Sequence, residues 1–277
     1  MIDFNSKRFY KKASDKNFNK ESEKQKIEEL NEREQRIIQQ EKQLKTNSEL
    51  FDDTIHEINK IYTLLESNAN KLRNAYELSR FDDFFDNILK DMEGNVSLLS
   101  IRLQLHRYMM NPSLTEKDQT GKFVIWKKVE KIYKCLYAEK AKKNLSIVMT
   151  GSNTKSFKLR NTIEIAIFII IENAIKYSPD NEVITINFVE NKNNLVVSFT
   201  NWGTCPSDEE MSRLTERGFR SAITRQNPTI KGSGLGLNIL EQICKSNGVD
   251  LNISKGNETK KISGIECNPF TIRLTFK

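Results

Sequence analysis

The 277-residue chain is poor in cysteine, and its four cysteines lie far apart. They are Cys135, Cys205, Cys244 and Cys267. No pair has the spacing of a zinc site or of a redox-active Cys-x-x-Cys motif. We therefore expect four free thiols, which are typical of proteins in a reducing compartment such as the cytoplasm.

A long apolar run is missing as well. The longest one, Ile163–Ile171, is interrupted by Glu164 and is far shorter than the ~20 apolar residues that a membrane-spanning helix needs. The first residues, Met1-Ile2-Asp3, lead directly into a charged segment, so the sequence predicts no signal peptide. We expect a cytoplasmic protein without a membrane span.

The net charge is +7, and much of the positive excess lies near the N-terminus. A basic segment of this kind can contact nucleic acid or an anionic membrane. Residues 1–20 also lack apolar periodicity, and such a composition is typical of a solvated tail. We predict a disordered tail there, with no direct contact to nucleic acid. Its basic residues are Lys7, Arg8, Lys11, Lys12, Lys16 and Lys20.

Glycine and proline are absent from residues 21–79, which predicts one long helix. Apolar residues recur there in a heptad pattern, which is typical of helices that pair. The main seam contains Leu30, Ile37, Leu44, Phe51, Ile58, Leu65 and Leu72. A weaker seam contains Ile27, Ile55, Tyr62 and Ala69, together with the polar residues Glu34, Glu41 and Ser48.

A second amphipathic helix is predicted between Phe81 and Met110, where Asn111-Pro112 ends it. The two helices, joined near Ser79-Arg80, form a hairpin within residues 21–112. A lone hairpin buries little surface, so we expect two copies to pair as a dimeric four-helix bundle. The alternative is a single hairpin that packs on the C-terminal domain.

Helices and mostly antiparallel strands are mixed in residues 120–277, which favours a two-layer α/β sandwich. The complete prediction is an α+β protein, with a long helical hairpin before the sandwich. We expect helices at 127–143, 159–177 and 234–246, and a polar segment at 207–231. Strands are expected at 123–126, 145–149, 183–188, 195–200, 250–254 and 271–276.

Two motifs of the C-terminal part carry chemistry. Asn173 follows a strongly apolar run, and a polar residue on a buried helix needs a partner such as Mg²⁺ or nearby backbone. Lys176 and Tyr177 lie one turn later on the same side, where they can meet a phosphate and a base. Gly232, Gly234 and Gly236 alternate with Ser233, Leu235 and Leu237 where a helix begins, and such a turn offers backbone N–H groups to an anion.

This pairing resembles the ATP-binding domain of sensor histidine kinases and of the related gyrase, Hsp90 and MutL ATPases. Residues 172–178 resemble the asparagine box of that family, and residues 232–237 its second glycine box. Arg217-Gly218-Phe219-Arg220 resembles the phenylalanine box of the mobile lid over ATP. Asn201-Trp202-Gly203 lies where the first glycine box belongs.

The resemblance implies a site for ATP and Mg²⁺, with Asn173 as the metal ligand. The residues implied to bind the nucleotide are Asn173, Lys176, Tyr177, Asn201, Gly203, Phe219, Arg220, Gly232, Gly234, Leu235, Gly236 and Leu237.

Three residues depart from the family pattern. Asn201 replaces the usual aspartate that accepts a bond from the adenine amino group, and an uncharged acceptor predicts weaker binding. Cys205 replaces the second glycine of the same box. Ile169 stands where gyrase-like members place a catalytic glutamate, which favours phosphoryl transfer over ATP hydrolysis.

A histidine kinase needs an acceptor histidine on the helical hairpin, and the chain has two histidines. His56 falls just outside the main seam, so its ring should face solvent, and His56-Glu57-Ile58-Asn59 resembles the acceptor box of the family. Glu57 would orient the ring or accept its proton. The family's proline one turn later is replaced by Lys60-Ile61. An ordinary exposed histidine is the alternative for His56, and His106 is expected to be packed or on the bundle surface.

The resemblance therefore implies a homodimeric histidine kinase that phosphorylates His56 and passes the phosphoryl group to a separate response regulator receiver domain. The sequence contains no recognisable receiver or sensory domain, so an upstream sensor protein is a further expected partner. Two alternatives stay open. One is a pseudokinase scaffold whose nucleotide site controls dimer shape, and the other is a serine kinase of the anti-sigma-factor type.

Overall fold

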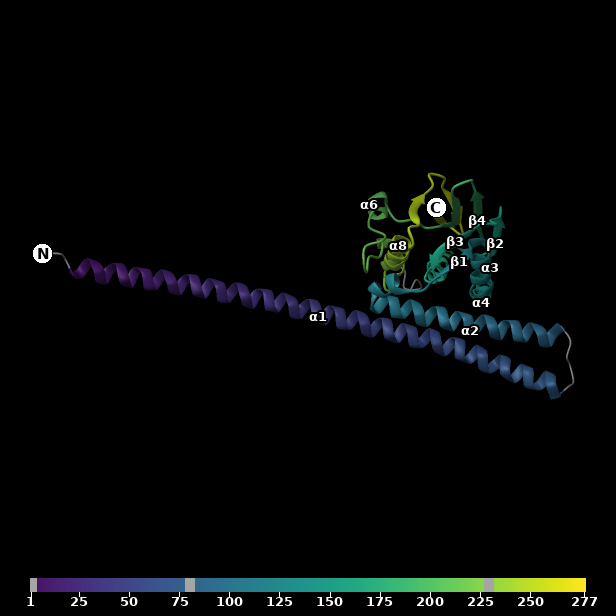
Figure 1. Ribbon diagram of the computed structural model, residues 1–277, viewed down its shortest axis with the longest axis horizontal. Helices are drawn as coiled ribbons and strands as arrows, with labels where there is room; N and C mark the ends of the chain where they lie inside the picture. The colour runs from purple at the N-terminus through teal and green to yellow at the C-terminus, as the bar shows by residue number, and fades with distance from the viewer. Residues whose placement is uncertain (1–3, 78–82, 227–231) are drawn as a thin grey trace. The chain divides into compact units, whose positions relative to one another are not determined.

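The computed structural model describes residues 4–77, 83–226 and 232–277 (Figure 1). Its contacts divide the chain into two units, residues 1–49 and 50–277. The first unit is the N-terminal part of helix α1 (Phe4–Glu77). The helix includes residues 4–20, in place of the disordered tail that the sequence predicts. Helix α1 contains no glycine or proline, so no residue within it breaks the helix.

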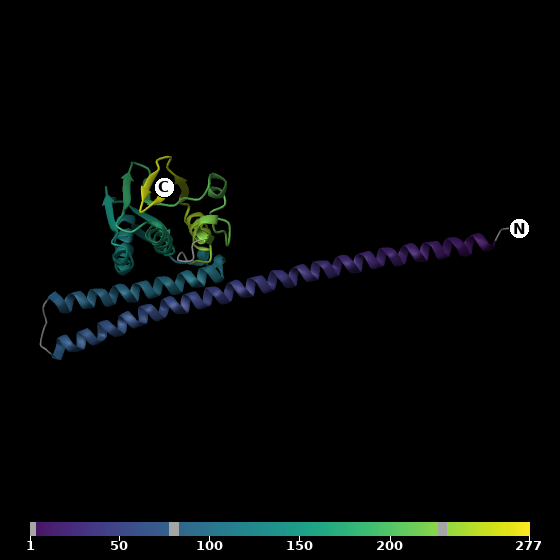
Figure 2. The ribbon, with the colours of Figure 1, turned by 180° about the vertical axis from the view of Figure 1, so that it is seen from behind.

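The second unit begins with a helical hairpin. The C-terminal stretch of α1 and helix α2 (Asp83–Met110) lie side by side in both views (Figures 1 and 2). Ile61 of α1 is buried with Leu98 and Ile101 of α2 in one apolar core. The predicted junction near Ser79-Arg80 lies outside the described residues.

Each helix of the hairpin also carries an apolar stripe with a spacing of seven residues. On α1 the stripe contains the exposed residues Ile55, Tyr62, Ala69 and Tyr76, and on α2 it contains Leu89, Val96, Leu103 and Met110. Val96 is 55% exposed and Leu103 is 48% exposed in the single chain. A heptad stripe that stays exposed in one chain is typical of a helix that packs against another copy.

The C-terminal part contains the expected two-layer α/β sandwich. Its main sheet has the order β2-β4-β5-β8-β6, with β2 parallel to β4 and the other neighbours antiparallel. The strands are β2 (Ser146–Thr150), β4 (Val183–Glu190), β5 (Leu195–Gly203), β6 (Asp250–Lys255) and β8 (Ile265–Phe276). The short strand β7 (Lys260–Ile262) pairs with β8, and β1 (Thr120–Val124) pairs separately with β3 (Ser156–Arg160).

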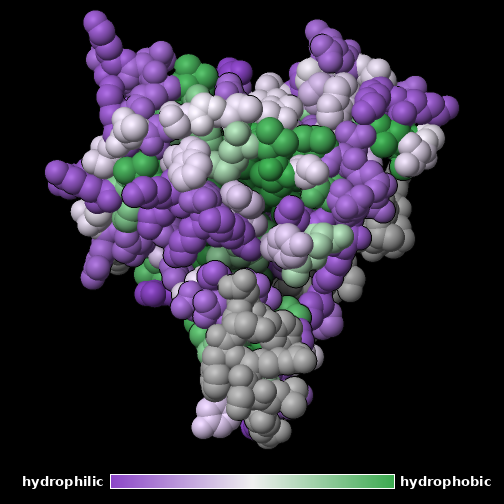
Figure 3. All heavy atoms as spheres, turned by 90° about the vertical axis from the view of Figure 1, so that its right-hand side faces the viewer, coloured by the Kyte–Doolittle hydropathy of each residue, from purple (hydrophilic) through white to green (hydrophobic). Residues whose placement is uncertain are grey.

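One face of this sheet is covered by helices, and α5 (Ile163–Tyr177) is the most apolar of them. Burial alternates along β5, so Leu195, Val197 and Phe199 join α5 in the core. On the opposite face of β2 and β4, Val148 and Val189 remain exposed. A side view of the molecule shows a mainly hydrophilic surface with a smaller apolar patch (Figure 3). The remaining helices are α3 (Ile125–Cys135), α4 (Tyr137–Lys142), α6 (Asp208–Met211), α7 (Ala222–Gln226), α8 (Gly236–Asn247) and the 3₁₀ helix η1 (Pro112–Lys117).

Several element boundaries differ from the prediction. The helix expected at 127–143 is divided at Leu136, which is fully buried, and no glycine or proline marks the break. The helix expected from residue 159 begins at Ile163, because residues 156–160 alternate between polar and apolar and form β3. The polar segment at 207–231 contains α6 and α7, which are too short to show helical periodicity.

Candidate nucleotide-binding site

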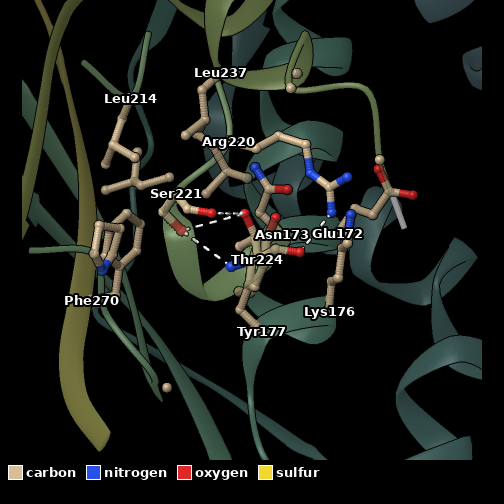
Figure 4. Close-up of a pocket in the computed structure, with 18 of the residues that line it drawn as sticks. Glu172, Asn173, Lys176, Tyr177, Leu214, Arg220, Ser221, Thr224, Leu237 and Phe270 are labelled. Carbon is tan, nitrogen blue, oxygen red and sulfur yellow. Dashed lines mark hydrogen bonds between the residues drawn. The ribbon is translucent and has the colours of Figure 1, made fainter. Parts of the chain in front are cut away.

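Most of the predicted nucleotide-binding residues line a pocket at the C-terminal end of α5 (Figure 4). The apolar run of α5 is buried against the sheet, and its last turns carry Glu172, Asn173, Lys176 and Tyr177 to the pocket wall. The other walls come from β5, β8, the segment between β5 and α8, and the glycine turn before α8. Of the twelve predicted nucleotide residues, only Leu235 is not part of the lining, which includes Asn173, Lys176, Tyr177, Asn201, Gly203, Phe219, Arg220, Gly232, Gly234, Gly236 and Leu237.

Asn201 is 4% exposed, and its side-chain orientation is fixed by its neighbour. Its Nδ2 donates a hydrogen bond to the backbone oxygen of Trp202 at 3.2 Å. The carboxamide oxygen is therefore the group available as an acceptor for a ligand in the pocket. An acceptor at this position suits the exocyclic amino group of adenine.

Gly203 follows on β5 and has no room for a side chain. A Cβ atom at this position would lie 2.6 Å from the backbone oxygen of Tyr177. The strand and the end of α5 therefore approach each other at a backbone-to-backbone contact that only glycine permits. Cys205, beyond this strand, is half-buried and its Sγ lies 3.6 Å from the backbone oxygens of Gly203 and Asn268.

The glycine turn contacts both α5 and the phenylalanine-box segment. A Cβ atom on Gly232 would lie 2.7 Å from Lys176 Nζ, so the turn closely approaches this ammonium group. A Cβ atom on Gly234 would lie 2.5 Å from the oxygen of Phe219, and Gly218 N–H donates to the oxygen of Gly234 at 3.1 Å. Leu235 is 2% exposed and anchors the turn in the core.

Residues 207–226 cover one side of the pocket and are held by polar contacts. Glu210 accepts hydrogen bonds from the backbone N–H groups of Ser207 and Ala222, at 3.2 and 2.8 Å. The Arg213 guanidinium lies 4.6 Å from the ring centroid of Phe219. Arg220 donates to the Thr224 oxygen at 2.8 Å. Arg220, Ser221 and Thr224 line the same pocket as Asn173 and Tyr177 of α5 (Figure 4).

The donor set around Asn173 suits a magnesium ion that is bound mainly through phosphate. Magnesium in nucleotide sites takes few protein oxygen ligands and keeps water and phosphate oxygens for the rest. Asn173 and Glu172 both line the pocket, and the Glu172 carboxylate forms an ion pair with Arg102. Among the described residues, no group of three or more His, Cys, Asp or Glu side chains could hold a metal without phosphate.

Tyr177 and Ile169 define two further properties of the site. Burial raises the pKa of the Tyr177 phenol, which Arg220 opposes, so the ring stays neutral at the pocket wall. Ile169 is 2% exposed, and its Cγ2 is 3.6 Å from a Cβ built on Gly236. An apolar, fully packed side chain at this position cannot act as a general base for water.

The family model of the histidine kinase-, DNA gyrase B- and HSP90-like ATPases matches residues 159–276. These residues resemble the ATPase domain of that family. The pocket described above lies in this ATPase domain, apart from Met109 at the end of α2. The four motifs that suggested the family from sequence are all within the matched range.

Part of the chain is similar to sensor histidine kinases. The sensor protein QseC of Escherichia coli (strain K12) is 27% identical over 129 residues, which is 46% of this chain and 27% of QseC. The histidine protein kinase SaeS of Staphylococcus aureus (strain bovine RF122 / ET3-1) is 31% identical over 102 residues, which is 35% of this chain and 28% of SaeS. A solved structure of the Acinetobacter baumannii histidine kinase AdeS covers 80% of this chain and 98% of its own, with a TM-score of 0.44 and 19% identity. The chain thus spans little more than a quarter of the curated relatives that it matches.

The ATPase domain is connected to α2 by contacts that the sequence did not predict. Arg102 forms an ion pair with Glu172, and its guanidinium lies 4.8 Å from the ring centroid of Phe168. Met109 lines the pocket, and Arg217 donates to its backbone oxygen at 3.4 Å. No sequence motif marks Arg102 or Met109, because their partners are 66 to 108 residues away.

The two histidines lie in different environments on the hairpin. His56 is exposed on α1, as its heptad position predicts, while the side chain of Glu57 lies outside the described part of the chain. The ring of His106 is half-buried and contacts Phe51 edge-on, at a centroid distance of 6.3 Å. His106 is therefore a packed histidine, as expected. No described helix is long and apolar enough to cross a membrane.

Proposed function

We propose that the chain is an ATP-dependent histidine kinase of a two-component system, which phosphorylates itself on His56. The observation that carries this proposal is the pocket in which Asn173, Lys176 and Asn201 meet the glycine turn. The exposed ring of His56 on a neighbouring helical hairpin supplies an acceptor that a donor domain can reach.

The pocket residues have separate parts in this proposal. The oxygen of Asn201 accepts a bond from the adenine amino group, and Tyr177 contacts the base. The ammonium of Lys176 and the N–H groups of the turn at Gly232–Gly236 bind the phosphates. Asn173 would hold Mg²⁺, which supplies positive charge to the phosphates when it is bound.

The transfer step depends mainly on the positioning of the reactants and on electrostatic stabilisation of the charge that moves between them. A ring nitrogen of His56 attacks the γ-phosphorus, the bond to the β,γ-bridging oxygen breaks, and ADP leaves. Glu57 would orient the imidazole or accept its proton. The buried Ile169 leaves no base at the position where related ATPases activate water, which favours transfer over hydrolysis.

The proposed partners follow from the acceptor and from the hairpin. A second copy would cover the exposed heptad stripes and complete a four-helix bundle. The phosphoryl group would then pass to the aspartate of a separate receiver domain. An upstream sensor protein is the proposed source of input, and the cytoplasm, where ATP is available, is the proposed location.

A catalytically weak scaffold is a second candidate, and Asn201 and Cys205 favour it. The neutral Asn201 forms a weaker bond to adenine than a carboxylate does, since charge-assisted hydrogen bonds are roughly twice as strong. A serine kinase that acts on a bound partner is the third candidate, because it would use the same pocket without His56.

Labelled ATP separates the three candidates. We expect the chain with Mg²⁺ to take up an acid-labile, base-stable phosphoryl label that is lost in His56→Ala and in Asn173→Ala. The matched control His106→Ala should keep the label, provided that its melting temperature shows it is folded. Tight ATP binding without label would support the scaffold, and acid-stable label on a protein substrate would support the serine kinase.

A further inference from the structure

The C-terminal end of α5 does not run into the glycine turn that usually supplies backbone donors to the last carbonyl groups of a helix. A helix leaves its final four carbonyl oxygens without intrahelical donors. Many helices satisfy them with a glycine in the left-handed conformation, which turns following N–H groups back toward the helix. Here Ser178 is extended, with φ −72° and ψ 139°, and Pro179 has no N–H to donate.

A lysine from another element takes that role. The Nζ of Lys143, just after α4, lies 3.1 Å from the backbone oxygen of Ile175, 2.8 Å from that of Lys176 and 2.8 Å from that of Ser178. One ammonium group thus uses its three protons on three carbonyl oxygens. Its positive charge also lies at the negative end of the helix dipole.

The remaining carbonyls of this turn are fixed as well. The oxygen of Ala174 accepts bonds from the backbone N–H and from the hydroxyl of Ser178. The oxygen of Tyr177 packs against Gly203 of β5. The backbone that carries Lys176 and Tyr177 is therefore held between Lys143 on one side and β5 on the other.

The backbone of Lys143 is itself hydrogen-bonded to the segment after α5. Asn181 N–H donates to the Lys143 oxygen at 2.9 Å, and the Asn144 side chain donates to the Asn181 side chain at 2.8 Å. A lysine with a fixed backbone and three short bonds has little freedom, so its ammonium can define the position of the helix end.

We propose that Lys143 is a positioning residue of the nucleotide site, which fixes the end of α5 and with it the approach of Lys176 and Tyr177 to the nucleotide. This inference rests on the proposed ATP binding. Lys143 is not part of the pocket lining and acts through the backbone of α5.

Calorimetric titration of the full chain with MgATP tests the proposal, because it reports the dissociation constant separately from the fraction of protein that binds. For Lys143→Met we expect a dissociation constant about tenfold higher, equivalent to ~1.4 kcal/mol. Lys143→Arg should recover most of the affinity, since a guanidinium keeps the charge and several donors. Lys142→Met, on the exposed neighbour, is the matched control and should bind like the wild type.

A role in folding alone predicts a different result. Lys143→Met would then show a lower binding stoichiometry with an unchanged dissociation constant, and this outcome overturns the proposal. In a Lys176→Met background the additional loss from Lys143→Met should shrink, because the two residues act through one contact. If the losses of affinity from the two substitutions add fully, Lys143 does not act through Lys176. A wild-type chain that binds no MgATP overturns the proposed function itself and is recognised before any variant is compared.

Discussion

Gly232 has no side chain, and this leaves room for the ammonium group of Lys176 beside the glycine turn. Its φ of 149° is rarely adopted by other residues, and a Cβ atom would approach the ammonium of Lys176 to 2.7 Å. Gly248, at the end of α8, has a φ of 64° and open space around it. The two glycines share a backbone requirement but differ in what surrounds them.

We therefore expect Gly232→Ala and Gly248→Ala to differ in nucleotide binding. Each should lower the free energy of unfolding by about 1 kcal/mol, because alanine is strained at positive φ. Only Gly232→Ala should raise the dissociation constant for MgATP, since it displaces Lys176. Thermal melts and calorimetric titration measure the two effects, and equal binding by both variants would contradict this interpretation.

The cysteines should divide into two classes by reactivity. Burial raises the pKa of Cys244 to about 12, with a further contribution from Glu241, and Cys267 is also buried with a raised pKa. Cys135 and Cys205 are only half-buried. At neutral pH we expect slow alkylation of the half-buried pair, and alkylation of the buried pair only after unfolding. Peptide mass spectrometry over time measures this, and rapid native labelling of Cys244 would show that its burial is incomplete.

At the scale of elements, Glu210 connects two short helices that are too small to be stable alone. Its carboxylate accepts from the N–H of Ser207 before α6 and from the N–H of Ala222 at the start of α7. These bonds lower the pKa of Glu210, with the bond from Ala222 as the largest cause. The charge of one side chain thus holds both ends of the segment over the pocket.

Glu210→Gln should weaken this segment without unfolding the ATPase domain. We expect faster amide exchange at Ala222 and Ser207, while the exposed neighbour variant Glu209→Gln leaves both rates unchanged. Because the pKa is lowered on folding, the stabilisation is present above the normal glutamate pKa and is lost as the pH falls through the lower folded value. The chemical shift of the Ala222 amide should change with pH in that acidic range. A chemical shift that stays constant there would exclude the contact.

Element prediction succeeded for the long helices and for strands β2, β4, β5, β6 and β8, and it failed at two local features. The two hairpin helices, α5 and α8 were predicted from periodicity that extends over several turns. Strand β3 was missed because five residues are too few to establish a period. The division of α3 from α4 was missed because it falls at the buried Leu136, and no glycine or proline there indicates a helix end.

At the scale of the whole molecule, the exposed heptad stripes of α1 and α2 determine the expected assembly. Val96 and Leu103 stand seven residues apart on α2, and both are about half exposed in one chain. Apolar stripes of this regularity are costly in water and are stabilised by a second copy.

We expect the wild-type chain to have twice the 32.2 kDa mass of one copy in light scattering at micromolar concentration. Val96→Glu and Leu103→Glu should each shift it toward the monomer, because a charge would be buried in the dimer interface. Asn87→Glu, at an exposed position outside the stripe, is the control. A monomeric wild type would favour the alternative of a single hairpin on the ATPase domain.

The amino-acid sequence by itself determined the long helices, the heptad seams and the order of the nucleotide motifs. It could do so because periodicity and motif spacing depend on residues close together in the chain. It also identified eleven of the residues that line the pocket, since each belongs to a short local motif.

Only the tertiary structure decided what holds these motifs in position. Lys143 reaches the end of α5 across 32 to 35 residues, Gly203 meets the backbone of Tyr177, and Arg102 pairs with Glu172 across 70. No local pattern encodes such contacts, because they depend on which elements folding brings together. The physical reason is that polar backbone groups at helix ends must find partners, and the fold selects them from distant parts of the chain.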